Sequence, residues 1–175
     1  MRRSVRVGAL VALAIVVALS LFLATRHPVS EATDAPSPLL GKVAPALSGT
    51  ELSGGSFDLA RERGKVVVVS FWASWCGPCV EEAPELSTFA WQERKSVVVV
   101  GVVFNDTVAA ASAFQAHYGS LYPSVIDPGG AIANRFGVSD PPTTFVIDRE
   151  GRVVVSLLGP VTTTQLHDVV ARFES

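Results

Sequence analysis

The chain has 175 residues, enough for one domain with its own hydrophobic core and a short additional segment. Its formal net charge is only −2 and no basic run occurs, which argues against a protein that binds nucleic acid or anionic lipid. Hydrophobic residues make up 49% of the chain, more than a small soluble domain usually carries, and the excess lies at the N-terminus.

The N-terminal segment has the composition of a membrane helix. Residues 7–25 carry no charge and are mostly Val, Ala, Leu and Ile, so a helix of this stretch would extend about 28 Å and just cross a bilayer core. Three arginines precede it and Arg26 alone follows closely, which places the rest of the chain outside the cytoplasm. We predict a membrane anchor or a signal sequence over residues 1–26. The length of the segment and the poor fit to a cleavage site favour a single-pass anchor over a removed signal.

The next segment separates this anchor from the folded part. Residues 27–42 hold several prolines among Ser, Ala, Thr and Asp, a composition that buries little apolar surface. Such a stretch is typical of a stiff, extended linker. We therefore predict a Pro-rich linker over residues 27–42 and one folded domain over residues 43–175, a usual size for a single core.

Within the domain, strand and helix periodicities alternate. The β-branched run over residues 65–71 is typical of a central strand buried on both faces. Asn105 or Asp106 is expected to cap the second helix. The order of elements predicts an α/β fold with a mixed sheet and helices on both of its faces. Strands are predicted at residues 56–59, 65–71, 96–104, 124–126, 143–147 and 152–157, and helices at 77–94, 107–118, 131–136 and 162–173.

The two cysteines of the chain stand together in Trp75-Cys76-Gly77-Pro78-Cys79, between the central strand and the first helix. The unpaired N–H groups and the dipole of a helix N-terminus stabilise a thiolate, so Cys76 is expected to be the nucleophile. Cys79 lies one turn further into the helix and can attack a mixed disulfide formed by Cys76. The sequence therefore predicts a redox-active dithiol with a nucleophilic and a resolving cysteine.

Two other interpretations of the cysteine pair fit the sequence less well. A structural bridge over two intervening residues closes a very small loop and constrains the unfolded chain little. A metal site needs two further ligands, but His27, His117, His167 and Met1 have no paired spacing. Both helical histidines are instead expected to face solvent. No cofactor is therefore expected beyond the redox-active Cys76–Cys79 disulfide.

Taken together, the chain resembles the thioredoxin superfamily, and more narrowly its membrane-anchored TlpA/ResA/CcmG branch, the thiol-disulfide oxidoreductases of cytochrome c maturation. The resemblance covers about residues 43–173 and implies a thioredoxin-like fold. It is carried by the segments VVVVSFWASWCGPC, VEEAP, GVVFNDT, YPSVIDPGGAIANRFGV and PPTTFVIDREGRV.

The resemblance also implies roles for residues outside the cysteine pair. Pro142, ahead of Thr143, matches the family's cis-proline, whose loop faces the cysteines and binds an extended substrate segment. Pro141 departs from the small or apolar residue that relatives often carry there, and this rigid neighbour is expected to narrow the choice of substrate. Trp75 is expected to shape the docking surface, because an aromatic ring beside the cysteines offers a large contact area.

Glu82 stands three residues after Cys79 and matches a buried acidic residue of this branch. A carboxyl desolvated beneath the cysteines has a raised pKa and can accept or return the proton of Cys79. Without the resemblance, a solvated glutamate is the plainer interpretation of such a position. That is what we expect of Glu81 and Glu85.

These inferences predict an extracytoplasmic protein-disulfide reductase that keeps the haem-binding cysteines of an apocytochrome c reduced. The resemblance implies that a membrane-embedded thiol-disulfide donor re-reduces it. A disulfide-forming oxidase is an alternative, because the same dithiol runs in either direction. A peroxiredoxin-type peroxidase needs a Pro- and Thr-rich setting that the residues before Cys76 lack. A non-enzymatic metal-binding module is the third alternative.

Overall fold

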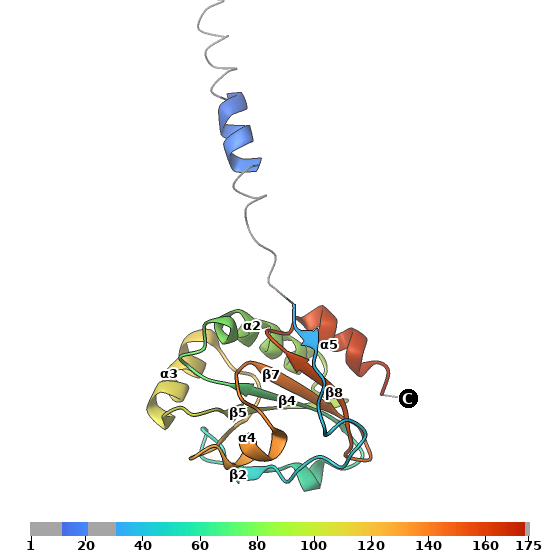
Figure 1. The fold of residues 1–175 in the computed structure, drawn as a ribbon. Coiled ribbons are helices and arrows are strands. Elements are labelled where there is room, and N and C mark those ends of the chain that lie inside the picture. Colours follow the sequence, from blue (N-terminus) through green and yellow to red (C-terminus); the bar gives the residue numbers. More distant parts are fainter. Residues whose placement is uncertain (1–11, 21–30, 174–175) are drawn as a thin grey trace, which may run out of the picture. The chain divides into compact units, whose positions relative to one another are not determined.

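The computed structural model describes residues 12–20 and 31–173 (Figure 1). The chain divides into two compact units, Met1–Ser30 and Glu31–Ser175. Residues 12–20 are helical, and the remainder of the predicted anchor lies outside the described residues. Within the described ranges, no helix combines the length and the apolar character needed to cross a bilayer.

The larger unit is built on a six-stranded mixed sheet in the order β1-β8-β7-β4-β5-β6. The neighbours β4–β5 and β5–β6 are parallel, whereas β4–β7, β7–β8 and β1–β8 are antiparallel. Every side chain of β4 is buried, which confirms the prediction that this β-branched run forms a central strand. The strands are β1 (Thr33–Asp34), β4 (Val66–Trp72), β5 (Val97–Val103), β6 (Ser124–Ile126), β7 (Thr143–Ile147) and β8 (Val153–Leu158).

Helices cover both faces of the sheet, as predicted (Figure 1). Alternate side chains of β4 point to opposite faces, so Val66 and Val68 pack with α2 and α5, whereas Val67 and Val69 pack with α4. The helices are α2 (Gly77–Gln92), α3 (Val108–Tyr118), α4 (Ala131–Phe136) and α5 (Thr163–Val170), with a short 3-10 helix, η1 (Leu59–Glu62). A small separate sheet pairs β2 (Ser48–Thr50) with β3 (Ser56–Asp58).

Helix α2 carries the cysteine pair to the end of the central strand. Cys76 is its N-cap residue and Pro78 lies in the first turn, where a missing N–H costs no intrahelical hydrogen bond. The buried face of α2 includes Cys79, Glu82 and Leu86, spaced three to four residues apart. The cysteines therefore lie at the carboxyl end of β4, with Glu82 one turn deeper on the same helix.

The structure corrects the prediction of a linker over residues 27–42. Residues 31–42 belong to the folded unit, where Thr33 pairs with Leu158 and the Ala32 N–H donates to the Pro160 carbonyl at 2.9 Å. A two-residue strand is held by backbone hydrogen bonds and needs no apolar periodicity, so the composition of this segment conceals it. The described part of the predicted linker is thus docked on the sheet.

Two local predictions also need correction. Thr107 caps α3 by accepting a hydrogen bond from the Ala110 N–H at 3.2 Å, so neither Asn105 nor Asp106 is the N-cap. The strand predicted at residues 56–59 pairs with β2, which has no apolar pattern and escaped prediction. It therefore extends a separate hairpin rather than the main sheet.

Candidate active site

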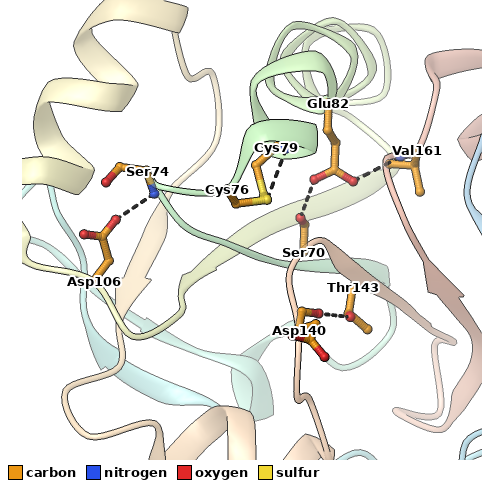
Figure 2. The surroundings of a disulfide bond; sticks show 9 residues. All are labelled: Ser70, Ser74, Cys76, Cys79, Glu82, Asp106, Asp140, Thr143 and Val161. Carbon is orange, nitrogen blue, oxygen red and sulfur yellow. Dashed lines mark hydrogen bonds between the residues drawn. A yellow bond between two sulfur atoms is a disulfide. The ribbon is translucent and has the colours of Figure 1, made fainter. Parts of the chain in front are cut away.

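The cysteines form a disulfide at the N-terminus of α2 (Figure 2). The two sulfur atoms lie 2.04 Å apart and the Cα atoms 5.3 Å apart. The Cys79 N–H donates to Cys76 Sγ at 3.2 Å. When the disulfide is reduced, this unpaired helix N–H is directed at the Cys76 sulfur and favours its thiolate form.

Burial does not separate the roles of the two cysteines. In the disulfide, Cys76 is 4% exposed and Cys79 1% exposed, and both belong to a buried cluster that includes Trp72 and Ala83. The difference between them lies in position, because Cys76 caps the helix and Cys79 lies inside its first turn. The capping position supports the prediction that Cys76 is the nucleophile.

Glu82 is buried next to the disulfide, with 1% of its surface exposed (Figure 2). Its Oε2 accepts a hydrogen bond from Ser70 Oγ at 3.2 Å, and its Oε1 accepts one from the Val161 N–H at 3.1 Å. Burial raises the pKa of Glu82 from 4.5 to about 7, because desolvation outweighs these two hydrogen bonds and a smaller stabilising effect of Thr144.

The Glu82 carboxyl therefore has the properties expected of a proton acceptor for Cys79. A group with a pKa of about 7 is well populated in both protonation states near neutral pH. Glu82 lies three residues after Cys79 on the same face of α2, so the two side chains are neighbours. The structure places Glu82 where the sequence predicts it, and its catalytic role stays a prediction.

The loop before β7 lies at the same end of the sheet as the disulfide. The peptide bond between Pro141 and Pro142 is cis, as the resemblance implies. Thr143 pairs with Phe71 near the end of β4, which brings this loop close to the start of α2. Thr143 Oγ1 donates to the Asp140 carbonyl at 2.7 Å, and the Gly159 N–H donates to the Pro142 carbonyl at 3.0 Å. The substrate-binding role of Pro142 and Thr143 stays a prediction.

The two tryptophans around the site have different environments. Trp75 is 58% exposed beside Cys76, and its Nε1–H donates to the Asn105 carbonyl at 3.1 Å. Trp72 is buried, stacks on Phe114 and donates from Nε1 to Ser124 Oγ. Trp75 therefore presents an oriented aromatic surface next to the disulfide, whereas Trp72 serves packing.

Asp106, predicted from the sequence only as a candidate helix cap, belongs to this site. Its Oδ2 accepts a hydrogen bond from the Ser74 N–H and its Oδ1 accepts one from the Thr107 N–H, both at 2.7 Å. The carboxylate thereby ties the loop that precedes Cys76 to the start of α3 (Figure 2). Asp106 and Ser74 are 32 residues apart, and no local pattern in the sequence indicates their contact.

Replacing Asp106 with alanine is expected to lower the free energy of unfolding by about 2 kcal/mol, because two backbone N–H groups lose a charged acceptor. Amide hydrogen exchange at Ser74 should accelerate in the same variant. Asp58→Ala is the matched control, since Asp58 accepts a backbone N–H from Ala60 and should cost about 1 kcal/mol. Unchanged exchange at Ser74 would mean that the loop is held without Asp106.

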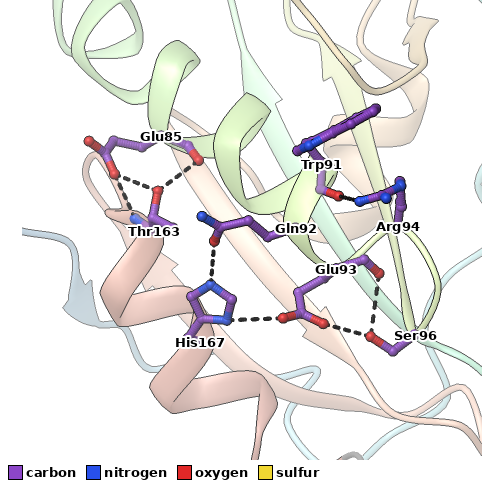
Figure 3. A network of polar contacts seen from close by, with 8 residues as sticks. All are labelled: Glu85, Trp91, Gln92, Glu93, Arg94, Ser96, Thr163 and His167. Atoms are coloured by element: carbon purple, nitrogen blue, oxygen red, sulfur yellow. Dashed lines mark hydrogen bonds and ion pairs between the residues drawn. The ribbon is translucent and has the colours of Figure 1, made fainter.

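Further along α2, polar contacts connect this helix to α5 (Figure 3). The Glu85 carboxylate accepts hydrogen bonds from Thr163 N–H at 2.8 Å and Thr163 Oγ1 at 2.6 Å, and these bonds lower the pKa of Glu85. His167 lies 2.8 Å from Gln92 Oε1 and 3.3 Å from Glu93 Oε1. Glu85 and His167 are partly exposed to solvent, as expected, and both also link α2 to α5.

Comparisons with known proteins agree with this geometry. Residues 39–172 match the Redoxin family. Thiol-disulfide oxidoreductase ResA of Bacillus anthracis is 35% identical over 129 residues, which cover 73% of this chain and 75% of that protein. The thiol:disulfide interchange protein HelX of Rhodobacter capsulatus is 38% identical over 142 residues, covering 78% and 76%.

Two further matches extend the comparison. ResA of Bacillus subtilis is 29% identical and aligns over 95% of this chain and 90% of its own. The crystal structure of a secreted Mycobacterium tuberculosis disulfide oxidoreductase, described as homologous to DsbE of Escherichia coli, superposes with a TM-score of 0.65 at 30% identity. It covers 72% of this chain and 95% of that one. The chain therefore belongs to the Redoxin family, among the ResA- and DsbE-like thiol-disulfide oxidoreductases.

Proposed function

We propose that this thiol-disulfide oxidoreductase reduces protein disulfides outside the cytoplasm, with the haem-binding cysteines of an apocytochrome c as its substrate. The observation that carries the proposal is the Cys76–Cys79 disulfide at the N-terminus of α2, with the Glu82 carboxyl buried beside it. This arrangement supplies a stabilised thiolate, a resolving cysteine and a proton acceptor, which are the groups that disulfide exchange requires.

The proposed reaction begins from the reduced dithiol. The Cys76 thiolate attacks one sulfur of the substrate disulfide, that S–S bond breaks, and a mixed disulfide and one substrate thiolate result. Glu82 takes the proton of Cys79, whose thiolate attacks Cys76 Sγ and releases the second substrate sulfur as a thiolate, to which the proton held by Glu82 then passes. Two electrons thereby pass to the substrate, and Cys76–Cys79 becomes a disulfide again. A membrane thiol-disulfide donor then reduces it for the next cycle.

Location on the extracytoplasmic face is supported by the N-terminal segment and by one relative. Residues 7–25 are uncharged and follow three arginines, the pattern of a single-pass anchor with its amino end in the cytoplasm. The Mycobacterium tuberculosis protein is described as secreted.

The reduction potential of the Cys76–Cys79 pair tests the direction of the reaction. The full chain is equilibrated in glutathione or dithiothreitol buffers, and the reduced fraction is measured by alkylation and mass spectrometry. A reduction potential of about −270 mV supports a reductase, whereas one of about −120 mV overturns that direction and indicates a disulfide donor.

Substrate and location need separate measurements. The reduced full chain should reduce an oxidised peptide with a Cys-x-x-Cys-His segment faster than an oxidised peptide with the histidine replaced. Equal rates would remove the haem-attachment segment as the preferred substrate.

In cells, the full chain should remain with the membrane fraction, and added protease should digest the domain once the outer face is accessible. Protection from that protease would contradict an extracytoplasmic domain.

Trp75→Ala is expected to lower kcat/KM for a protein disulfide by about tenfold, because an exposed aromatic beside the nucleophile supplies much of a docking surface. Reduction of the Cys76–Cys79 disulfide by dithiothreitol should stay within about twofold, since so small a thiol needs little docking area. Trp91→Ala is the matched control, because Trp91 is equally exposed, 58%, at the far end of α2. Equal losses in both variants would remove Trp75 as a specific docking residue.

A further inference from the structure

Beneath Glu82, two hydroxyl side chains interrupt the apolar surface of the sheet. Ser70 on β4 and Thr144 on β7 are directly paired across the two strands, and both are fully buried at 0% exposure. Their strand neighbours on this face, Val68 and Val146, are apolar and pack into the core below α2 and α5. Two hydroxyls at this one level of the sheet therefore call for a specific partner, because burying a polar group without one is costly.

The Glu82 carboxyl is that partner. Ser70 Oγ donates to Glu82 Oε2 at 3.2 Å, while the Val161 N–H holds Oε1 at 3.1 Å (Figure 2). Thr144 stabilises the charge of the same carboxyl. Yet Thr144 Oγ1 forms no hydrogen bond with any described residue. Thr144 is thus a buried hydroxyl with spare hydrogen-bonding capacity beside the proposed proton acceptor.

We propose that Ser70 and Thr144 are positioning residues for Glu82. Their hydroxyls hold the Glu82 carboxyl in both of its protonation states, while the carboxyl takes and returns the proton of Cys79. The inference rests on the proposed role of Glu82 in the reaction. It adds two residues, on β4 and β7, that act through Glu82 and do not touch the reacting sulfur atoms.

The chemistry of a hydroxyl explains why these residue types suit the task. A Ser or Thr hydroxyl can donate a hydrogen bond to a carboxylate and can accept one from a protonated carboxyl. When Glu82 takes the proton of Cys79, the new O–H needs an acceptor, and Thr144 Oγ1 has a free lone pair for it. A valine at either position would leave both states of the carboxyl less well satisfied, the ionised state most.

The titratable surroundings of Glu82 are limited in the described part of the chain. Tyr122 responds to the Glu82 charge, and burial and that charge raise the pKa of Tyr122 so that its phenol stays protonated through neutral pH. The cysteines on α2 do not titrate while they form the disulfide. None of the ion pairs found among the described residues includes Glu82. Its titration in the oxidised protein therefore reports mainly burial and hydrogen bonding.

The test is a carbon-13 NMR titration of the glutamate carboxyls in the oxidised full chain. Ser70→Ala should raise the pKa of Glu82 by about one pH unit and Thr144→Val by a smaller amount, because each removes a hydroxyl that stabilises the charged form. Thr144→Ser keeps the hydroxyl and should stay within a few tenths of the unmodified chain. Ser87→Ala is the control, since it removes a buried α2 hydroxyl that bonds to Gly119 instead.

A second measurement connects this shift to the reaction. Rapid-mixing kinetics follow the resolution of the mixed disulfide by Cys79, and its pH midpoint should rise in Thr144→Val by the same amount as the titration. Unchanged titration midpoints in folded Thr144→Val and Ser70→Ala would overturn the inference, as would an equal shift in Thr144→Ser. If Thr144→Val does not fold, Ser70→Ala and Thr144→Ser decide the question.

The titration needs no substrate, so its outcome is independent of the proposed function. A raised midpoint together with no activity toward protein disulfides would contradict the proposed function and leave the positioning role in place.

Discussion

Replacing Cys79 with serine is expected to trap the enzyme as a mixed disulfide with its protein substrate, and replacing Cys76 with serine is expected to prevent that adduct. Cys76 caps α2 and receives the Cys79 N–H at its sulfur, so its thiolate is the stabilised one. Serine at position 79 leaves the attack by Cys76 intact but removes the resolving thiolate. Either substitution should lower the turnover of protein disulfides by about a thousandfold or more.

Non-reducing mass spectrometry after mixing with an oxidised protein identifies the adduct and the cysteine that holds it. The double Cys76→Ser, Cys79→Ser variant is the control for thiol-independent association. The assigned roles would be reversed if the Cys76→Ser variant formed an adduct through Cys79 while the Cys79→Ser variant formed none through Cys76. The nearly equal burial of the two cysteines makes this a real test, because exposure alone predicts no difference between them.

Glu82→Gln is expected to remove a pH dependence of stability between about pH 4.5 and pH 7. The pKa of Glu82 is 4.5 in its ordinary state and about 7 in the fold, so the folded state retains a proton that the unfolded chain has lost. The contribution of Glu82 to the free energy of unfolding is therefore fully present below about pH 4.5. It is lost as the pH rises through about 7 and does not change further above that. The total difference is about 3 kcal/mol.

Denaturant unfolding of the oxidised full chain across this pH range measures the effect as a difference between the two proteins. Glutamine can accept from the Val161 N–H and donate to Ser70, so the variant should fold and be the more stable protein at pH 8. Glu85→Gln is the matched control: the pKa of Glu85 is lowered, so its contribution is lost only as the pH falls below this window. If the stability of Glu82→Gln still changed with pH in this range, another group would be its cause.

The same variant tests the chemistry of the reaction. If Glu82 is the proton acceptor, resolution of the mixed disulfide by Cys79 should accelerate as the pH rises through about 7. Glu82→Gln should lose this inflection and slow the step by about a hundredfold at neutral pH. A pH profile that is the same in both proteins would exclude Glu82 as the acceptor, whatever its effect on stability.

The order of the elements was predictable because the periodicity of apolar residues reports which faces are buried. The run over residues 65–71 became β4, residues 143–147 became β7, and residues 131–136 became α4. The elements that escaped prediction include β1 and β2, which are two and three residues long. Such short strands depend on backbone hydrogen bonds to distant partners, and their side chains carry no repeating pattern.

The candidate site divides in the same way. The sequence by itself determined the dithiol, because its residue types and its place between a strand and a helix are local properties. The position of Glu82 on the cysteine face of α2 follows equally from helical spacing. Through the resemblance, the sequence also indicated the cis peptide bond before Pro142.

Only the tertiary structure decided what surrounds these residues. The contacts of Asp106 with Ser74, of Ser70 with Glu82 and of Val161 with Glu82 join residues 32, 12 and 79 positions apart. The raised pKa of Glu82 is likewise a tertiary property, because desolvation by the assembled sheet and helices causes it. Local patterns specify which groups the site contains, whereas burial and long-range hydrogen bonds specify which of them hold a proton at neutral pH.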